Sequence, residues 1–200
     1  MIKNIIFDMG NVLLAYTPHE YIKTVTSDEK AAEAILKELF YSSEWLKLDE
    51  GIITEEEAVK NVCQRIPQYS ELVQKAMDDW HTNLTPIEGM PELVKKLKSK
   101  NYGIYLLSNA SLRFYSYKDN FEQLFRHFDG IIISAKEKKA KPNRDIYECI
   151  CERFSLIPEE CLFIDDLQRN IDGAIDAGLN AHLFKGPEEL NRYLEELNIL

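Results

Sequence analysis

Five short apolar runs, each bounded by polar residues or glycine, constrain the fold of this chain more than any other feature. They lie at residues 5–7, 104–107, 131–134, 161–164 and 181–184. Uniformly apolar runs of this length are typical of parallel strands that are buried on both faces of a sheet. Segments with helical periodicity alternate with them, at residues 91–100, 144–154, 170–178 and 187–197. The alternation predicts an α/β fold, a doubly wound parallel sheet with helices on both faces.

One long segment, residues 16–88, breaks this alternation. It contains no convincing strand, only amphipathic helical patterns. Thr54 and Glu57 form a capping-box pattern there, and Ser70 is a candidate helix N-cap. We therefore predict an all-helical insertion within an α/β core that consists of residues 1–15 and 89–200.

The net charge and the cysteines restrict the classes of partner and compartment. The formal charge is −10 at pH 7, and nucleic-acid binding relies on Lys and Arg, so we expect no nucleic-acid partner. No apolar run approaches the ~20 residues of a membrane-spanning helix, so we expect no membrane association. The start MIKNIIF has no signal-peptide layout, and the four cysteines lack paired CxxC spacing. We interpret the cysteines as core residues and expect a cytoplasmic protein, and nothing in the sequence indicates an oligomeric state.

Polar residues follow the predicted strands at the point where each strand ends. They are Asp8, then Ser108 and Asn109, then a lysine-rich loop at residues 135–145, and finally Asp165 and Asp166. Ligands bind at this edge of a parallel sheet, so we expect these side chains to converge. Three carboxylates brought together repel one another unless a cation neutralises them. Mg²⁺ prefers such oxygen ligands together with a substrate phosphate, and the pattern therefore predicts a phosphoryl-handling site.

Four sequence elements at these positions resemble the four motifs of the haloacid dehalogenase (HAD) superfamily. They are FDMGNVL, LLSNA, KPNRDIY and FIDDLQRNIDGA, which occur in the order, spacing and strand context of that family. The resemblance covers nearly the whole chain and implies a Rossmann-like core with residues 16–88 as a helical cap. It also implies a Mg²⁺-dependent phosphatase that acts on a small phosphorylated metabolite through an aspartyl-phosphate intermediate.

The resemblance also implies a role for individual residues. Asp8 would be the nucleophile, and such covalent catalysis divides one difficult displacement into two easier ones. Lys141, which only the following proline and the motif order distinguish from neighbouring lysines, would neutralise the phosphoryl group and the nucleophile. Ser108 would hydrogen-bond the phosphoryl oxygens, and Asn109 would help through its backbone or its amide. The implied Mg²⁺ ligands are three carboxylates and one backbone carbonyl: Asp8, Gly10, Asp165 and Asp166. Two residues of the following helix, Asn170 and Asp172, would orient the Asp165 loop.

Gly10 departs from most phosphatases of this family, which carry a second aspartate at that position. That aspartate protonates the leaving group and then activates water, a contribution typically worth 10²- to 10⁴-fold. Glycine keeps the backbone carbonyl for the metal but lacks the acid. Three outcomes stay open. Slow or selective hydrolysis could persist with a leaving group that needs little protonation, with another group such as His19, Glu20 or a substrate hydroxyl as the acid, or with water that enters by a different path. The protein could instead bind phosphate compounds in a non-catalytic, regulatory role. It could also be a metal-free 2-haloacid dehalogenase, against which the pair Asp165 and Asp166 argues.

The stretch FDMGNVLL resembles a branch of the superfamily in which glycine is usual at this position and a helical cap follows. That branch resembles sugar phosphatases, including enzymes acting on glucose 1-phosphate, whose leaving oxygen is less basic than that of an ordinary alcohol. Candidate substrate contacts on the inner face of the cap are aromatic or imidazole side chains: His19, Tyr21, Tyr41, Trp45, Trp80 and His81. The sequence does not distinguish a sugar phosphate from another small phosphomonoester.

Overall fold

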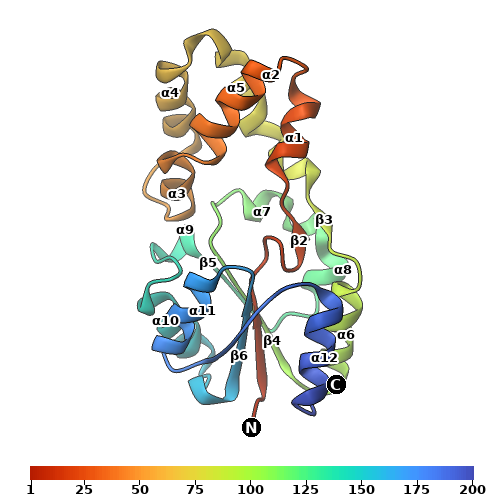
Figure 1. Ribbon diagram of the computed structural model, residues 1–200. Coiled ribbons are helices and arrows are strands. Elements are labelled where there is room, and N and C mark those ends of the chain that lie inside the picture. The colour runs from red at the N-terminus through yellow and green to blue at the C-terminus, as the bar shows by residue number, and fades with distance from the viewer.

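The computed structural model describes residues 1–200 and contains the expected parallel sheet (Figure 1). The five strands lie side by side in the order β5-β4-β1-β6-β7, and every neighbouring pair is parallel. Their bounds are β1 (Asn4–Phe7), β4 (Gly103–Ser108), β5 (Gly130–Ile133), β6 (Cys161–Asp165) and β7 (Asn180–Leu183). Each strand coincides with one of the five apolar runs, which confirms the α/β fold class.

The central strand β1 explains why the apolar runs are continuous. Ile5 pairs with Ile104 on one side and with Leu162 on the other, and Ile5, Ile6 and Phe7 are fully buried. Side chains alternate along a strand, so Ile5 and Phe7 belong to one apolar cluster, whereas Ile6 belongs to a second cluster on the opposite face. A strand covered on both faces has no position for a polar side chain until it reaches its end.

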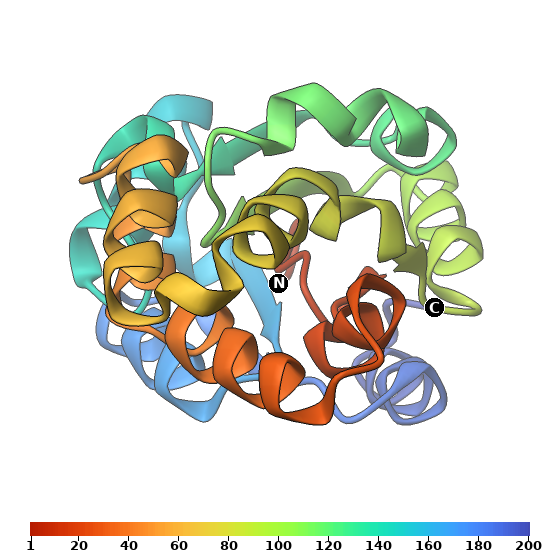
Figure 2. The ribbon, with the colours of Figure 1, turned by 90° about the horizontal axis from the view of Figure 1, so that it is seen from above.

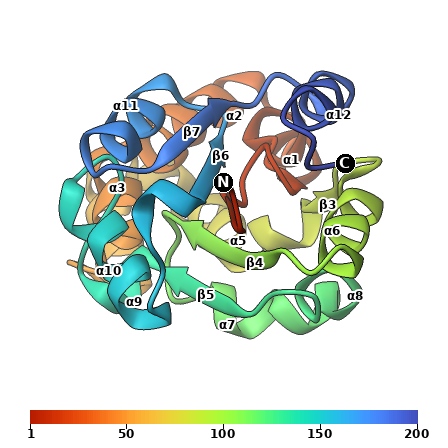
Figure 3. The ribbon, with the colours of Figure 1, turned by 90° about the horizontal axis from the view of Figure 1, so that it is seen from below.

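Helices cover both faces of the sheet, as the view from below shows (Figure 3). The second cluster includes buried residues of α10 and α11, whereas α6 and α12 pack against the other face. The core helices are α6 (Met90–Ser99), α7 (Phe114–Tyr117), α8 (Glu122–Phe125), α9 (Ser134–Glu137), α10 (Arg144–Phe154), α11 (Gln168–Asp176) and α12 (Pro187–Glu196). This arrangement is the predicted doubly wound architecture.

An all-helical cap lies above the carboxyl ends of the strands (Figures 1 and 2). Its helices are α1 (Pro18–Val25), α2 (Glu29–Ile35), α3 (Ser43–Asp49), α4 (Glu55–Arg65) and α5 (Ser70–Asp79). All of them lie between the short strands β2 (Leu14–Ala15) and β3 (Thr85–Pro86), which pair with each other in antiparallel fashion. The inserted cap is thus confirmed as part of the fold, and the domain boundaries at residues 16 and 88 stay a prediction.

Two local expectations for the segment 16–88 are wrong. Strand β3 lies inside the segment, but two residues that include a proline are too short to show strand periodicity. Ser70 is the first residue of α5 rather than its N-cap, because a 3₁₀ turn runs directly into the helix and the Ser70 hydroxyl donates to the carbonyl of Pro67 (2.9 Å). The capping box of Thr54 and Glu57 is confirmed, with both reciprocal hydrogen bonds present.

The remaining sequence expectations concern cysteines and membrane spans. All four cysteines are free thiols, and three of them are buried, in agreement with their interpretation as core residues. None of the helices combines the length and the apolar character that a bilayer-spanning segment requires.

Candidate active site

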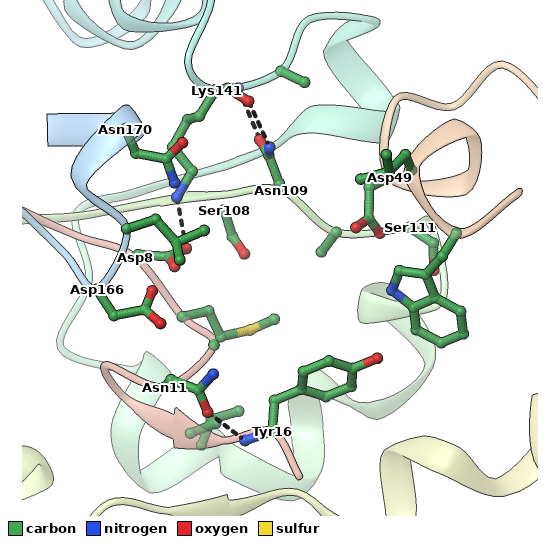
Figure 4. A pocket seen from close by; sticks show the side chains of 18 of the residues that line it. Asp8, Asn11, Tyr16, Asp49, Ser108, Asn109, Ser111, Lys141, Asp166 and Asn170 are labelled. Atoms are coloured by element: carbon green, nitrogen blue, oxygen red, sulfur yellow. Dashed lines mark hydrogen bonds and ion pairs between the residues drawn. The ribbon is translucent and has the colours of Figure 1, made fainter. Parts of the chain in front are cut away.

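A cavity of about 370 Å³ lies between the carboxyl ends of the strands and the underside of the cap (Figure 4). The core contributes the residues that follow β1, β4 and β6, and the cap contributes side chains from α3 and from the segment after α5. The sequence-predicted core residues that line it are Asp8, Gly10, Ser108, Asn109, Lys141, Asp166 and Asn170. Asp165 is fully buried directly behind them.

Asp8 stands at the end of β1, where the sheet meets the cavity. Its backbone N–H donates to the carbonyl of Ile164 in β6 (2.9 Å) and so continues the hydrogen bonding between the two strands. The sheet itself therefore fixes the position of Asp8. The Asp8 side chain is almost buried, and Lys141 Nζ lies 2.7 Å from Asp8 Oδ1. Burial raises the pKa of Asp8 to about 7; the Lys141 ammonium opposes this rise and the negative charge of Asp165 adds to it.

Asp165 ends β6 and is held by an array of donors. Asp165 Oδ2 lies 2.7 Å from Lys141 Nζ, and Asp165 Oδ1 accepts from the backbone N–H of Leu167 (2.9 Å). The Asn170 amide donates to both carboxylate oxygens, at 2.9 and 3.0 Å. The prediction that Asn170 orients this loop therefore agrees with the geometry. The same prediction for Asp172 is wrong, because its exposed carboxylate accepts from Gln168 along its own helix (2.8 Å).

The three acids at the strand ends converge as expected. Asp8, Asp165 and Asp166 each place a carboxylate oxygen within 4.8 Å of the others. Asp166 is half-buried, and burial followed by the charge of Asp165 raises its pKa. Three ionised carboxylates and the single ammonium of Lys141 together carry a net charge of −2. One divalent cation would balance this charge. Carboxylate oxygens are the ligands that Mg²⁺ and other hard cations prefer, so the donor set fits such an ion.

The structure separates Lys141 from the other lysines of its loop. Its side chain is buried between Asp8 and Asp165. Burial alone would lower the pKa of Lys141, but the two carboxylates outweigh burial and raise it, so the ammonium stays charged. The neighbouring lysines lie outside the cavity: Lys136 over the Tyr115 ring, Lys138 on the carbonyl of Gly51, and Lys139 near the carbonyl of Asp145.

Asn109 holds the Lys141 loop in place. Its amide group donates to the carbonyl of Lys141 and accepts from the Lys141 backbone N–H, both at 2.9 Å. Both ends of the side-chain amide are thus engaged with the backbone of Lys141, which changes the expected role of that amide from substrate contact to support. Ser108, at the end of β4, is buried and borders the cavity beside Asp8 (Figure 4).

Gly10 lines the cavity and leaves space around itself. A Cβ atom built at this position would meet no other atom within 4 Å. The absence of a side chain is therefore not forced by packing. Of the acids considered as replacements, His19 and Glu20 are exposed on α1 and do not line the cavity.

The cap contributes fewer of the expected contacts than the sequence suggested. Of the candidates, Trp45 and Trp80 line the cavity. Tyr21 is buried inside the cap and donates to the carbonyls of Lys75 and Ala76, at 3.3 and 3.2 Å. The other three, which do not line the cavity, are His19 and Tyr41, whose rings pack against each other, and His81, which stacks on Tyr117.

Sequence reasoning missed several residues that line the cavity. The polar and charged ones among them are Asn11, Tyr16, Asp49, Glu50, Ser111, Tyr117 and Arg169. Asn11 adopts a left-handed conformation (φ 56°), and its side-chain oxygen Oδ1 accepts from the Tyr16 backbone N–H at 3.0 Å, which explains an Asn after the glycine. Asp49 is the last residue of α3, where the helix dipole disfavours a negative charge. That unfavourable placement was the signal that could have identified it.

The fold is a parallel sheet with a helical cap, and an acidic site lies at the strand ends beneath the cap. These features define the class of protein, a capped α/β protein with an acidic site. A family model of haloacid dehalogenase-like hydrolases matches residues 2–178. The chain belongs to this family, and the expectation of a hydrolytic enzyme is confirmed.

Curated relatives align along most of the chain at low identity. The sesquiterpene phosphatase astK of Aspergillus oryzae is 24% identical over 88% of this chain and 87% of its own length. The D-ribitol-5-phosphate phosphatase of Bacteroides thetaiotaomicron is 26% identical over 100% of this chain and 98% of its own length. Other relatives are longer, and the chain spans 62% and 37% of two of them.

Solved structures share the fold. The HAD family enzyme bt-2542 of Bacteroides thetaiotaomicron, in complex with magnesium and inorganic phosphate, has a TM-score of 0.73 and 23% identity, with 93% of this chain and 96% of that chain covered. An L-2-haloacid dehalogenase of Xanthobacter autotrophicus has a TM-score of 0.69 and 18% identity, with 100% of this chain and 85% of that chain covered. At these identities the likeness establishes the fold alone.

Proposed function

We propose that this protein is a Mg²⁺-dependent phosphatase that hydrolyses a small phosphomonoester through an aspartyl-phosphate on Asp8. The observation that carries the proposal is the convergence of Asp8, Asp165 and Asp166 within 4.8 Å, beside the buried ammonium of Lys141. Two relatives named as phosphatases and a structural neighbour bound to magnesium and phosphate support phosphoryl chemistry.

The proposed metal ligands are hard oxygen atoms at the strand ends. The carboxylates of Asp8, Asp165 and Asp166 and the backbone carbonyl of Gly10 would hold Mg²⁺. The bound ion would supply positive charge that neutralises phosphoryl oxygens. Asn170 supports this set indirectly, because its amide fixes the orientation of the Asp165 carboxylate.

The protein's own residues would perform the covalent chemistry. Asp8 would attack phosphorus with a carboxylate oxygen, and the Lys141 ammonium favours the ionised form of Asp8 that this attack requires. Lys141 would also face the phosphoryl oxygens, held there by Asn109. The Ser108 hydroxyl would donate to a phosphoryl oxygen as charge accumulates on it.

The substrate in this proposal is a small phosphorylated metabolite, and a sugar phosphate is one candidate. The cavity of about 370 Å³ falls in the range typical of small-molecule sites. Its phosphoryl end is polar and charged, whereas Tyr16, Trp45 and Trp80 form part of the wall under the cap.

Hydrolysis of p-nitrophenyl phosphate and of a panel of sugar phosphates, with Mg²⁺ or with EDTA, tests the proposal. We expect turnover with Mg²⁺, loss of turnover in EDTA, and at least about 10³-fold slower turnover after Asp8→Asn, because the nucleophile is removed. Phosphate binding without turnover would instead indicate the non-catalytic alternative. Halide release from 2-haloacids that persists in EDTA would indicate the dehalogenase alternative.

A further inference from the structure

The carboxyl and ammonium groups on the core side of the cavity already have other proposed roles: Asp8 as the nucleophile, Asp166 as a metal ligand, and Lys141 as the counter-charge. Phosphoryl transfer to Asp8 leaves negative charge on the departing oxygen of an alcohol, and hydrolysis of the aspartyl-phosphate then needs a base to accept a proton from water. Gly10 supplies neither group, and the candidates His19 and Glu20 lie outside the cavity. A carboxyl group that lines the cavity elsewhere could serve both steps.

We propose that Asp49, carried into the cavity by the cap helix α3, is the general acid and base of the reaction. This inference rests on the proposed phosphatase function and names a catalytic residue for it. Asp49 lines the same cavity as Asp8 and Ser108, and Figure 4 shows its carboxyl group facing the cavity from the side opposite Asp8. In an in-line displacement the leaving oxygen departs opposite the attacking one, which is where a donor is required.

Contacts across the boundary between cap and core hold Asp49 at this position. The hydroxyl of Ser134, a fully buried residue of the core, donates to the Asp49 backbone carbonyl. The next residues are held in the same way, because Lys138 Nζ donates to the carbonyl of Gly51. The core therefore fixes the backbone of Asp49 at the edge of the cavity when the cap is docked.

The electrostatic environment suits a group that gives and takes a proton near neutral pH. Burial, followed by the negative charges of Asp8 and Glu50, raises the pKa of Asp49 to about 7, against the opposing effects of the Ser111 backbone and of Lys141. Two phenols line the same cavity as Asp49, those of Tyr16 and Tyr117, and their own pKa values are raised by burial and by the Asp49 charge. Phenols with raised pKa values stay protonated at neutral pH, so they cannot act as the base for water.

The proposed steps balance in atoms and protons. In the first, an Asp8 oxygen forms a bond to phosphorus, the bond from phosphorus to the leaving oxygen breaks, and the Asp49 carboxylic acid gives its proton to that oxygen. In the second, the Asp49 carboxylate takes a proton from water, the water oxygen bonds to phosphorus, and the bond between phosphorus and Asp8 breaks. Inorganic phosphate leaves, and both carboxyl groups return to their starting states.

Leaving-group dependence distinguishes this role from a structural one. We would measure kcat/KM for Asp49→Asn on p-nitrophenyl phosphate, whose leaving group needs little protonation, and on an alkyl phosphate, whose leaving group needs it. The expected loss is about 10²-fold or more on the alkyl ester and less than about tenfold on the aryl ester. The matched control Asp78→Asn removes a cap charge that does not line the cavity, and we expect equal, small effects on both esters.

A second variant returns the acid to the core. Because a side chain at Gly10 meets no neighbour within 4 Å, Gly10→Asp in the Asp49→Asn background should recover at least tenfold of the alkyl phosphate activity.

The pH dependence gives a further readout. For the alkyl phosphate, kcat/KM of the wild-type protein should decline above about pH 7, where Asp49 loses its proton, and this decline should be absent in Asp49→Asn.

The outcomes separate the two proposals. If the wild-type protein turns over both esters and Asp49→Asn lowers kcat/KM by the same factor on each, the catalytic role of Asp49 is overturned and the proposed phosphatase function still stands. No turnover of either ester by the wild-type protein would contradict the proposed function and, with it, this inference.

Discussion

Lys141 sets the electrostatic balance of the site, because its ammonium lies 2.7 Å from a carboxylate oxygen of both Asp8 and Asp165. Buried ion pairs contribute little net stability, but the removal of one partner leaves uncompensated buried charge. The sequence alone could name Lys141 only through the following proline and the motif order, since a lysine in a charged loop is usually solvated. The Lys141 backbone is held by two hydrogen bonds from the Asn109 side chain, and no local sequence pattern reveals this long-range contact.

Lys141→Met should destabilise the protein in a pH-dependent way. Burial already raises the folded-state pKa of Asp8 to about 7, and loss of the ammonium raises it further. A carboxyl group whose folded pKa exceeds its unfolded value binds its proton more tightly when folded, so stability falls as pH rises through that range. Urea unfolding in EDTA should give a loss of about 3–5 kcal/mol at pH 9 and a smaller loss at pH 6. Equal losses of stability at both pH values would contradict this balance. Lys139→Met, which removes a half-buried lysine outside the cavity, serves as the control.

Helix α3 and the loop after it form the element that connects cap and core. Gly51 follows α3 with φ +65°, and a Cβ atom there would collide with the backbone carbonyl of Ala135. The Arg113 guanidinium also pairs with Glu55 at the start of α4. These contacts dock the end of α3 on the core and bring Asp49 to the cavity.

Gly51→Ala should therefore impair catalysis as well as stability. The matched control is Gly89→Ala, which has a similar φ (+83°) but only a Pro187 side-chain atom at 3.8 Å as its nearest neighbour. Each variant should lose about 1–2 kcal/mol of stability from the left-handed backbone. Only Gly51→Ala should also lower kcat/KM with Mg²⁺, by tenfold or more. Similar kinetic losses in both variants would show that docking at Gly51 does not matter for activity.

At the scale of the whole molecule, cap and core share one apolar cluster. Its 41 buried residues include members of β1, of α6 and of the cap helices, so the cap is packed as part of the same body. The apolar runs and helical periodicities predicted the sheet, most helices and the cap, because those patterns report burial directly. They could not predict β3, whose two residues are too short for a period, or the cap residues that face the cavity. Which side of an amphipathic cap helix meets the site depends on docking, and the displaced acid Asp49 became visible only in three dimensions.

The proposed reaction requires that the phosphoryl group passes through Asp8. The most direct test mixes the wild-type protein with p-nitrophenyl phosphate and Mg²⁺, quenches the reaction in acid before steady state, and determines by mass spectrometry which residue is phosphorylated. We predict a phosphoryl group on Asp8 that is absent in EDTA and absent from Asp8→Asn. Turnover that proceeds with an unmodified Asp8, or with the phosphoryl group on another residue, would contradict the central claim.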